Sequence, residues 1–508
     1  MNYKDSKIST LILLFFSFFA PLGAVALFNL DEGAFGEATR EMVASGNYLT
    51  TYLNGELRFD KPILIYWLQS ASVHLFGLSE FSLRLPSAIF AAFWGLVIFY
   101  FTKRHFDESK ALLAVVFFVS SLQISIIAKA AIADGLLNFF IACSMFLIYE
   151  YISSRDKKWL YFTFAAIAFG VLAKGPVAIM VPFVVSALFL FYKKEPMFWL
   201  KSIFNPIGIL LFLSIALPWY ILEYIDQGQK FIDGFFLKHN VSRFSSSMEG
   251  HSGSIFYFIP VLILGLTPFT TYFLNIFRKL KDIFKNDLEI FLFIWFAFVF
   301  LFFSFSSTKL PHYVIYGYTP LFILGSIYAQ GIKNRFVLIL PSVLFLSILC
   351  MLPILVNNFS YMIRDEYTIS LLPTIFEHFD VFYSLKIAVA IALILFFWYS
   401  KIFKYFQKIL FVAIVFISAI NFVVMPALAQ IEQQPIKEAG LKAKSQGLRV
   451  TMYKLNYPTF SVYSQSIVKR ENPLVGECVV TKTIHLKDFK SYDVIFQKSG
   501  ISLIKIKE

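Results

Sequence analysis

The sequence predicts an all-α protein that crosses a membrane about thirteen times, and two observations lead to this prediction. The chain of 508 residues is 58% hydrophobic and only 15% charged, whereas roughly a quarter of a soluble globular chain is charged. Its apolar residues also gather in runs close to the ~20 residues that a helix needs to cross the hydrocarbon. One protein core cannot bury this much apolar surface, so we expect lipid to solvate much of it.

The apolar runs define the expected spans. The first run is too long for a signal-peptide core and has no small-x-small cleavage site, so it is interpreted as an uncleaved first helix. The two runs between residues 159 and 192 are among the shortest. The expected spans cover residues 9–30, 82–102, 110–128, 134–152, 159–173, 175–192, 202–221, 254–274, 288–306, 311–330, 335–356, 381–400 and 407–426.

Lys and Arg gather in alternate, short connections between these runs, and the positive-inside rule places those connections in the cytoplasm. The net charge of +13 therefore reflects membrane topology, and we expect no nucleic-acid partner. The three cysteines form no disulfide or zinc framework. With the N-terminus inside, an odd number of spans leaves the tail outside. The inner basic residues are Lys4, Lys7, Lys103, Arg104, Lys110, Arg155, Lys157, Lys158, Lys193, Lys194, Lys201, Arg278, Lys279, Lys281, Lys285, Lys333, Arg335, Lys401, Lys404 and Lys408.

The first outer loop, residues 31–81, is too long and too patterned for a simple connector. Residues 36–44 carry apolar side chains at helical spacing, and the stop signal Ser45-Gly46-Asn47 follows them. Residues 62–76 begin with proline and are rich in aromatics. Both segments are predicted to be amphipathic helices lying in the membrane interface. Such a loop can form one wall of a lateral cleft that admits a lipid tail.

Acidic residues stand at the outer ends of two expected spans. Asp31 and Glu32 directly follow the first span, where an acid is costly unless it is hydrated, paired or functional. A carboxylate there can act as a general base toward an acceptor hydroxyl or phosphate. Asp134 opens the fourth span, where capping of the helix N-terminus is the structural alternative.

Three outer lysines, Lys61, Lys174 and Lys309, lie next to or within two residues of a proline. Each is a point charge suited to a phosphate, although a lone lysine can also simply cap a helix or sit in interfacial water. Asp60 and His239, from two distant loops, are ligand types that can share a divalent cation.

These elements together resemble the membrane glycosyltransferases of the C-type fold, in the branch of protein O-mannosyltransferases and bacterial lipid A aminoarabinose transferases. The resemblance runs in order over roughly residues 5–325. It implies a sugar donor linked to a polyprenyl phosphate, used at the outer face of a bacterial inner membrane. It also implies inverting transfer to an acceptor oxygen of lipid A, a glycan or a protein. The matching elements are Asp31-Glu32, GEATREMVASGNYLTTYLNGELRFDKPILIYWL, GLSEFSLRLPSA, AKAAIADGLL, LAKGPVAIMVP, FFLKHNVSRF and STKLPHYVIYGYTPL.

The resemblance also implies residue roles. Two positions depart from the family pattern, since Ala34 stands where Arg or Tyr is frequent and Asp60 stands where the aminoarabinose branch has Glu. Both departures leave the sugar and the acceptor open. The implied catalytic acids are Asp31, Glu32 and Asp134. The implied donor-phosphate contacts are Lys61, Lys174, Arg243, Lys309, His312 and Tyr313. The implied ligands of a divalent metal cation are Asp60 and His239.

The tail, residues 431–508, is more polar than the membrane domain expected over residues 1–430. Its short alternating stretches at 448–454 and 492–497 predict a small outer α/β domain. The main functional alternative is a lipid or solute transporter or flippase without covalent chemistry, which would place ionisable groups near mid-membrane. A third possibility, an oligosaccharyl or O-antigen transfer enzyme, is disfavoured because the sequence lacks the Trp-Trp-Asp motif of the oligosaccharyltransferase branch.

Overall fold

The computed structural model describes residues 3–235, 253–329 and 335–507, and helices dominate it. Each expected span contains helix over much of its length. Seven of the described helices are long and apolar enough to cross a membrane, so the count of about thirteen crossings remains a prediction. These seven are α4 (Glu80–His105), α7 (Asp134–Ser154), α11 (Pro206–Gln227), α17 (Asp287–Phe305), α19 (Arg335–Phe359), α21 (Val381–Tyr399) and the continuous stretch of α22 (Tyr405–Ala419), η4 (Ile420–Val424) and α23 (Met425–Glu432).

The other expected spans are shorter or broken helices. Within one expected span, Ser121 separates two helices. Within another, Pro268, which has no N–H to donate, lies between two helices. These elements are α1 (Tyr3–Phe18), α5 (Glu108–Ser120), α6 (Leu122–Ile127), α8 (Lys157–Lys174), α9 (Val177–Tyr192), α14 (Phe258–Gly265), α15 (Thr270–Arg278), the 3-10 helix η2 (Pro311–Gly317) and α18 (Tyr318–Ile327). Short connecting helices are α10 (Pro196–Ile203), α12 (Gln229–Phe231), α16 (Leu280–Ile283), η3 (Ser360–Met362) and α20 (Glu366–His378).

The first span differs from its prediction. Its helix, α1, ends at Phe18 rather than near residue 30, and residues 19–30 turn irregularly. Arg84 of α4 supplies the reason, since its guanidinium donates to the carbonyls of Leu22, Val25 and Ala26 at 2.8–3.0 Å. These carbonyls are therefore satisfied without a helix. Asp31 and Glu32 consequently do not directly follow a span, but begin a new helix.

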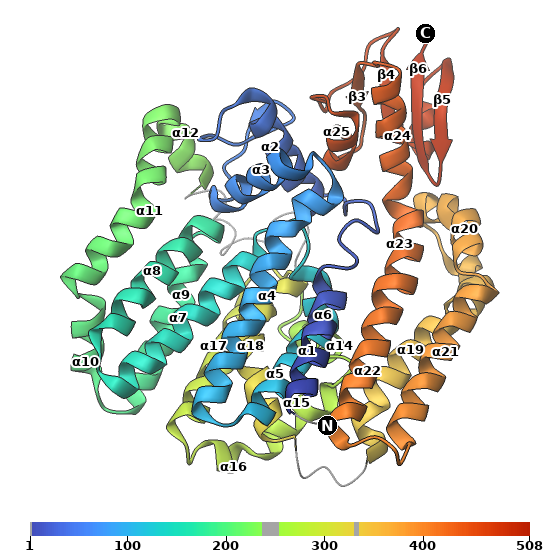
Figure 1. Ribbon diagram of the computed structural model, residues 1–508. Helices are drawn as coiled ribbons and strands as arrows, with labels where there is room; N and C mark the ends of the chain where they lie inside the picture. Colours follow the sequence, from blue (N-terminus) through green and yellow to red (C-terminus); the bar gives the residue numbers. More distant parts are fainter. Residues whose placement is uncertain (1–2, 236–252, 330–334, 508) are drawn as a thin grey trace.

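The first outer loop contains the two predicted helices. The first of them, α2 (Asp31–Ser45), ends where Gly46 takes the left-handed conformation at φ 71°, as the Ser-Gly-Asn stop signal predicts. The second, α3 (Leu64–Phe76), follows the short hairpin of β1 (Tyr52–Leu53) and β2 (Glu56–Leu57). Figure 1 shows α2 and α3 at the same end of the bundle as the C-terminal strands, with the N-terminus and α16 at the other end.

The tail forms a small sheet against helices. Its strand order is β3-β4-β6-β5, with β3 parallel to β4 and the other pairs antiparallel. The predicted stretches at 448–454 and 492–497 contain β3 and most of β5, while the domain boundary at residue 431 stays a prediction. The elements are α24 (Gln434–Ser445), β3 (Val450–Met452), α25 (Pro458–Ser464), β4 (Cys478–Lys482), η5 (Thr483–Asp488), β5 (Tyr492–Lys498) and β6 (Ile501–Ile506).

Helix α25 of the tail packs directly on the beginning of α2. A Cβ added at Gly33 would lie 2.6 Å from both the backbone nitrogen and Cγ2 of Thr459, so this position has no room for a side chain. The Tyr463 hydroxyl accepts the backbone N–H of Leu27 at 2.8 Å, and Thr459 bonds Asn29. The C-terminal chain therefore helps to position the helix that begins at Asp31.

Candidate active site

Asp31 stands in the first turn of α2 and its side chain is exposed, although protein surrounds it on most sides. This surrounding protein raises the pKa of the Asp31 carboxyl, and the negative charge of Asp134 raises it further. The cations Lys174 and Lys61 oppose the rise. Leu30, immediately before Asp31, has φ 67°, a conformation that non-glycine residues rarely adopt. Asp31 is therefore an accessible carboxylate in a confined, highly charged setting.

Asp134 and Lys174 form a buried ion pair beside Asp31. The Lys174 Nζ donates to both Asp134 carboxylate oxygens at 2.6 and 2.7 Å, and both side chains are less than a tenth exposed. The Tyr316 hydroxyl lies 3.4 Å from one of these oxygens, and Lys174 Nζ lies 5.7 Å from the Tyr316 ring centroid. Asp134 lies in the first turn of α7, where the helix N-terminus favours a carboxylate, but no side-chain cap hydrogen bond is formed there. The carboxylate instead neutralises Lys174.

Asp60 and Lys61 follow the β1–β2 hairpin and face the same region. Asp60 accepts a hydrogen bond from Lys61 Nζ at 2.8 Å and from Arg58 Nη2 at 3.1 Å. Arg58 also donates to the Tyr66 hydroxyl at 3.2 Å, and its guanidinium lies 5.5 Å from the Phe35 ring centroid. Both cations are mostly buried, with 12% of the Arg58 and 11% of the Lys61 side chain exposed. This part of the site is thus rich in positive charge.

Glu32 has surroundings quite unlike those of Asp31. It is 1% exposed, and its carboxylate accepts from Arg84 at 2.6 and 2.7 Å, from the Phe28 N–H at 2.8 Å and from the Ala131 N–H at 2.7 Å. Each oxygen is therefore already satisfied twice. This carboxylate joins α2, α4 and the 128–133 turn, and these contacts do not support the predicted role of Glu32 as a catalytic acid.

Lys309, also predicted as a phosphate contact, caps a helix in the structure. It is 6% exposed, and its Nζ donates to the Ser304 and Ser306 carbonyls at 2.9 and 2.8 Å, at the end of α17. His312 and Tyr313 follow on η2. His312 interacts electrostatically with Asp134. The Tyr313 ring centroid lies 5.0 Å from that of Phe303.

The proposed metal pair cannot be assembled from the described residues. His239 and the predicted phosphate contact Arg243 lie outside them. Within residues 3–235, 253–329 and 335–507, no group of three or more His, Cys, Asp or Glu side chains could hold a metal ion. Asp60 already faces the two cations Arg58 and Lys61, which would compete with a divalent ion. The divalent cation predicted at Asp60 and His239 therefore stays a prediction.

The fold brings together five of the predicted residues from four separate segments: Asp31, Asp60, Lys61, Asp134 and Lys174. Sequence reasoning missed Arg58, Arg84 and Tyr316. All three lie inside the motifs that carried the family resemblance, so the motifs themselves held the signal. Charge alone did not distinguish Arg84, which pairs within the structure, from a residue that faces a ligand.

Comparison with known proteins places this geometry among transferases. Residues 60–222 match the family model of dolichyl-phosphate-mannose-protein mannosyltransferases. A protein of Aquifex aeolicus (strain VF5) is 32% identical over 68% of this chain and 78% of its own length. The undecaprenyl phosphate-alpha-4-amino-4-deoxy-L-arabinose arabinosyl transferase of Wigglesworthia glossinidia brevipalpis is 29% identical over 66% of this chain. The match spans 61% of that transferase.

Solved structures share the fold. ArnT from Cupriavidus metallidurans bound to undecaprenyl phosphate aligns with a TM-score of 0.83 over 99% of this chain and 98% of its own, at 19% identity. The oligosaccharyltransferase of Archaeoglobus fulgidus aligns with a TM-score of 0.50 over 92% of this chain and 64% of its own, at 12% identity. The shared architecture extends through the C-terminal sheet, since the ArnT alignment covers nearly the whole chain.

Proposed function

The chain belongs to the membrane glycosyltransferases of the C-type fold, and from this membership we propose that it transfers a sugar from a polyprenyl phosphate to an acceptor oxygen. The transfer would invert the anomeric centre and take place at the outer face of a bacterial inner membrane. The observation that carries the proposal is the exposed Asp31 carboxylate, enclosed by Lys61 and the Asp134–Lys174 pair.

In the proposed reaction, Asp31 acts as the general base. The acceptor oxygen attacks the anomeric carbon of the donor, a new carbon–oxygen bond forms, and the bond from that carbon to the phosphate oxygen breaks. The acceptor proton passes to Asp31, and the polyprenyl phosphate leaves with an additional negative charge. A raised pKa suits this role, because a base works best when its pKa lies closer to the working pH.

Lys61 is the proposed contact for the leaving phosphate. It lies near enough to Asp31 to influence the carboxyl electrostatically, so a donor phosphate at Lys61 would present its anomeric carbon close to the base. Lys174 has a different proposed role. Lys174 donates to both carboxylate oxygens of Asp134, so its proposed role is to hold Asp134 in place and to balance its charge. In this role Lys174 is not the first contact of the donor phosphate.

Two other functions are less well supported. A transporter would carry its ionisable groups near mid-membrane. Here Asp31 opens α2, and the residues that interact with it lie at the start of α7, at the end of α8 and in the loop after β2. Oligosaccharyl transfer shares the fold at lower similarity and would need the Trp-Trp-Asp motif that the sequence lacks.

The proposal is tested by mass spectrometry of three pools from cells with and without this gene: lipid A, surface glycan and periplasmic proteins. We expect one pool to lose a pentosamine or hexose in the deletion strain. The full chain should restore that mass, and a chain carrying Lys61→Met should not. Identical spectra in all three pools would overturn the proposal. The pool that changes identifies the acceptor class, and the mass difference identifies the sugar class.

A further inference from the structure

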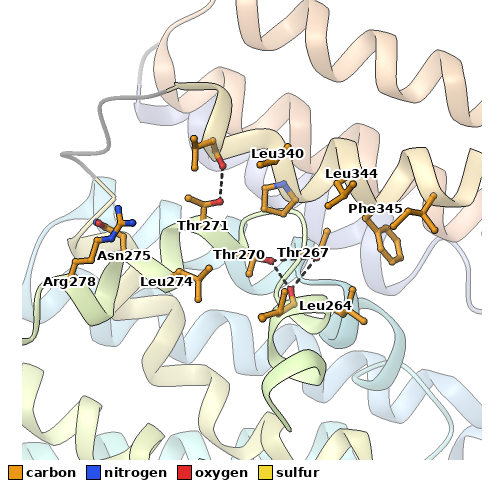
Figure 2. Close-up of a pocket in the computed structure, with 14 residues that line it drawn as sticks. Leu264, Thr267, Thr270, Thr271, Leu274, Asn275, Arg278, Leu340, Leu344 and Phe345 are labelled. Atoms are coloured by element: carbon orange, nitrogen blue, oxygen red, sulfur yellow. Dashed lines mark hydrogen bonds between the residues drawn. The ribbon is translucent and has the colours of Figure 1, made fainter. Parts of the chain in front are cut away.

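A groove of about 390 Å³ lies between α14 and α15 on one side and α19 on the other, well away from the Asp31 site. Figure 2 shows its side chains, with Arg278 and Asn275 at one end and Phe345 at the other. Several of the apolar side chains in its wall are exposed large hydrophobics, among them Leu264, Leu274, Leu340 and Leu344. In water such a groove would be costly, and its exposure therefore indicates contact with lipid.

The three threonine hydroxyls inside the groove, those of Thr267, Thr270 and Thr271, donate to protein carbonyls. Pro341 lies inside α19, and its missing N–H would have been the helical donor to the Val337 carbonyl. Thr271 of α15 supplies that donor instead, with its Oγ1 2.7 Å from the Val337 oxygen (Figure 2). Thr270 Oγ1 likewise donates to the Ile263 carbonyl at 2.8 Å. The middle of the groove therefore offers an occupant mainly methyl and methylene surface.

One end of the groove is cationic. Arg278 is the last residue of α15 and is exposed; among the described residues it makes no ion pair. Two of the neighbouring basic groups, Lys279 and Lys285, both pair with Asp282. An unneutralised guanidinium beside an apolar groove matches a phosphodiester that carries hydrocarbon chains, since arginine presents a planar fork to phosphate oxygens.

The groove also has the length of half a bilayer. Its α19 wall runs from Val337 to Ile348, and twelve helical residues extend about 17 Å. Half of the ~30 Å hydrocarbon core is about 15 Å. The Arg278 end is continuous with α16, which lies at the same end of the molecule as the N-terminus (Figure 1). This is the end that the distribution of Lys and Arg places at the cytoplasmic surface.

We propose that this groove binds an anionic glycerophospholipid of the inner leaflet, with its phosphate at Arg278 and one acyl chain along Leu340, Leu344 and Phe345. The lipid would pack α19 against α14 and α15 along the groove. This site is distinct from any sugar-carrier site, because it lies at the opposite end of the bundle from Asp31.

The test compares the purified full chain in nanodiscs of phosphatidylcholine alone and of phosphatidylcholine with phosphatidylglycerol. Thermal unfolding reports stabilisation, and native mass spectrometry reports retained lipid. We expect phosphatidylglycerol to raise the melting temperature and to be retained. Arg278→Gln should reduce retention about fivefold and remove the gain in melting temperature, as expected for one basic contact with an anionic lipid. Leu344→Trp, which fills the groove from an exposed position, should also lose retention.

Lys285→Gln is the matched control, since Lys285 belongs to the same basic connection but pairs with Asp282 outside the groove. It should behave like the unchanged chain. Equal retention in all four proteins would overturn the proposal, and so would an equal loss in Lys285→Gln, which would indicate general surface charge. A dimer that disappears with Leu344→Trp would show instead that a second copy of the chain fills the groove.

Discussion

Asp31 and Glu32 are neighbours in the chain, yet the fold gives their carboxylates opposite surroundings. Glu32 points into the protein and is fully satisfied by Arg84 and two backbone N–H groups. Asp31 remains exposed among unlike charges. The sequence predicted two adjacent acids at a membrane boundary, but it did not predict that their carboxylates would have different surroundings. The difference depends on Arg84, which pairs with Glu32 from a different helix.

Removing Arg84 tests the structural role of Glu32. Arg84→Met leaves the buried Glu32 carboxylate without its cation, which should destabilise the chain by about 3–5 kcal/mol. The double variant Arg84→Met, Glu32→Gln should recover part of this loss because the unpaired charge is gone. Thermal unfolding in detergent measures both. A melting temperature unchanged by Arg84→Met would contradict the structural role of Glu32.

The surroundings of Asp31 predict a pH dependence. A general base is active when ionised, so turnover should fall as the pH drops through the raised pKa of Asp31, above the ~3.9 of an ordinary aspartate. Lys61 lowers that pKa. In Lys61→Met, the fall of the residual turnover on the acidic side of the pH profile should therefore move to higher pH. Lys498→Met, in the C-terminal sheet, should leave this fall in place. If the acidic side of the pH profile of Lys61→Met is unchanged or moves to lower pH, the assignment of Asp31 as the base is contradicted.

At the scale of elements, α2 is held between the membrane helices and the tail. Apolar run length predicted where the helices lie, and the Ser-Gly-Asn signal predicted the end of α2. The start of α2 and the end of α1 could not be predicted from local sequence, because both follow from Arg84 and from α25, which contact them across long stretches of chain. Such tertiary contacts override local helical pattern.

The contact between α25 and α2 should affect turnover. Gly33→Ala places a methyl group 2.6 Å from Thr459 backbone nitrogen, so α25 or the start of α2 must shift, and with it Asp31. We expect turnover to drop roughly tenfold, equivalent to about 1.4 kcal/mol of activation free energy. Gly23→Ala is the matched control, since its Cβ would meet Phe81 at an ordinary 3.8 Å. Equal turnover in the two variants would show that this contact does not position Asp31.

At the scale of the whole molecule, residues from four segments that the sequence predicts to lie outside converge on one end of the bundle. The sequence predicted this convergence through topology, since charge bias assigned all these segments to one side. It did not predict which partner each cation would take: Lys174 and Lys309 were equivalent to Lys61 by type and by a nearby proline, yet Lys174 pairs with Asp134, Lys309 caps α17 and Lys61 pairs with the neighbouring Asp60. Partner choice depends on distances that only the packed helices define.

The proposed orientation predicts opposite labelling at the two ends. In a chain whose three native cysteines are replaced by alanine, Lys442→Cys in the tail and Lys157→Cys at the start of α8 both lie at exposed positions. A membrane-impermeant thiol reagent added to spheroplasts should label Lys442→Cys and leave Lys157→Cys unlabelled until the membrane is opened. The reverse pattern would place the Asp31 site in the cytoplasm.

The most direct measurement is turnover of the purified full chain carrying Asp31→Asn, with a polyprenyl-phosphate sugar donor and the acceptor pool identified in cells. We predict that turnover falls at least about 100-fold, the contribution of a general base, while undecaprenyl phosphate binds as before. Asp233→Asn, an exposed aspartate near α12, should retain full turnover. Unchanged turnover in Asp31→Asn would contradict the proposed mechanism.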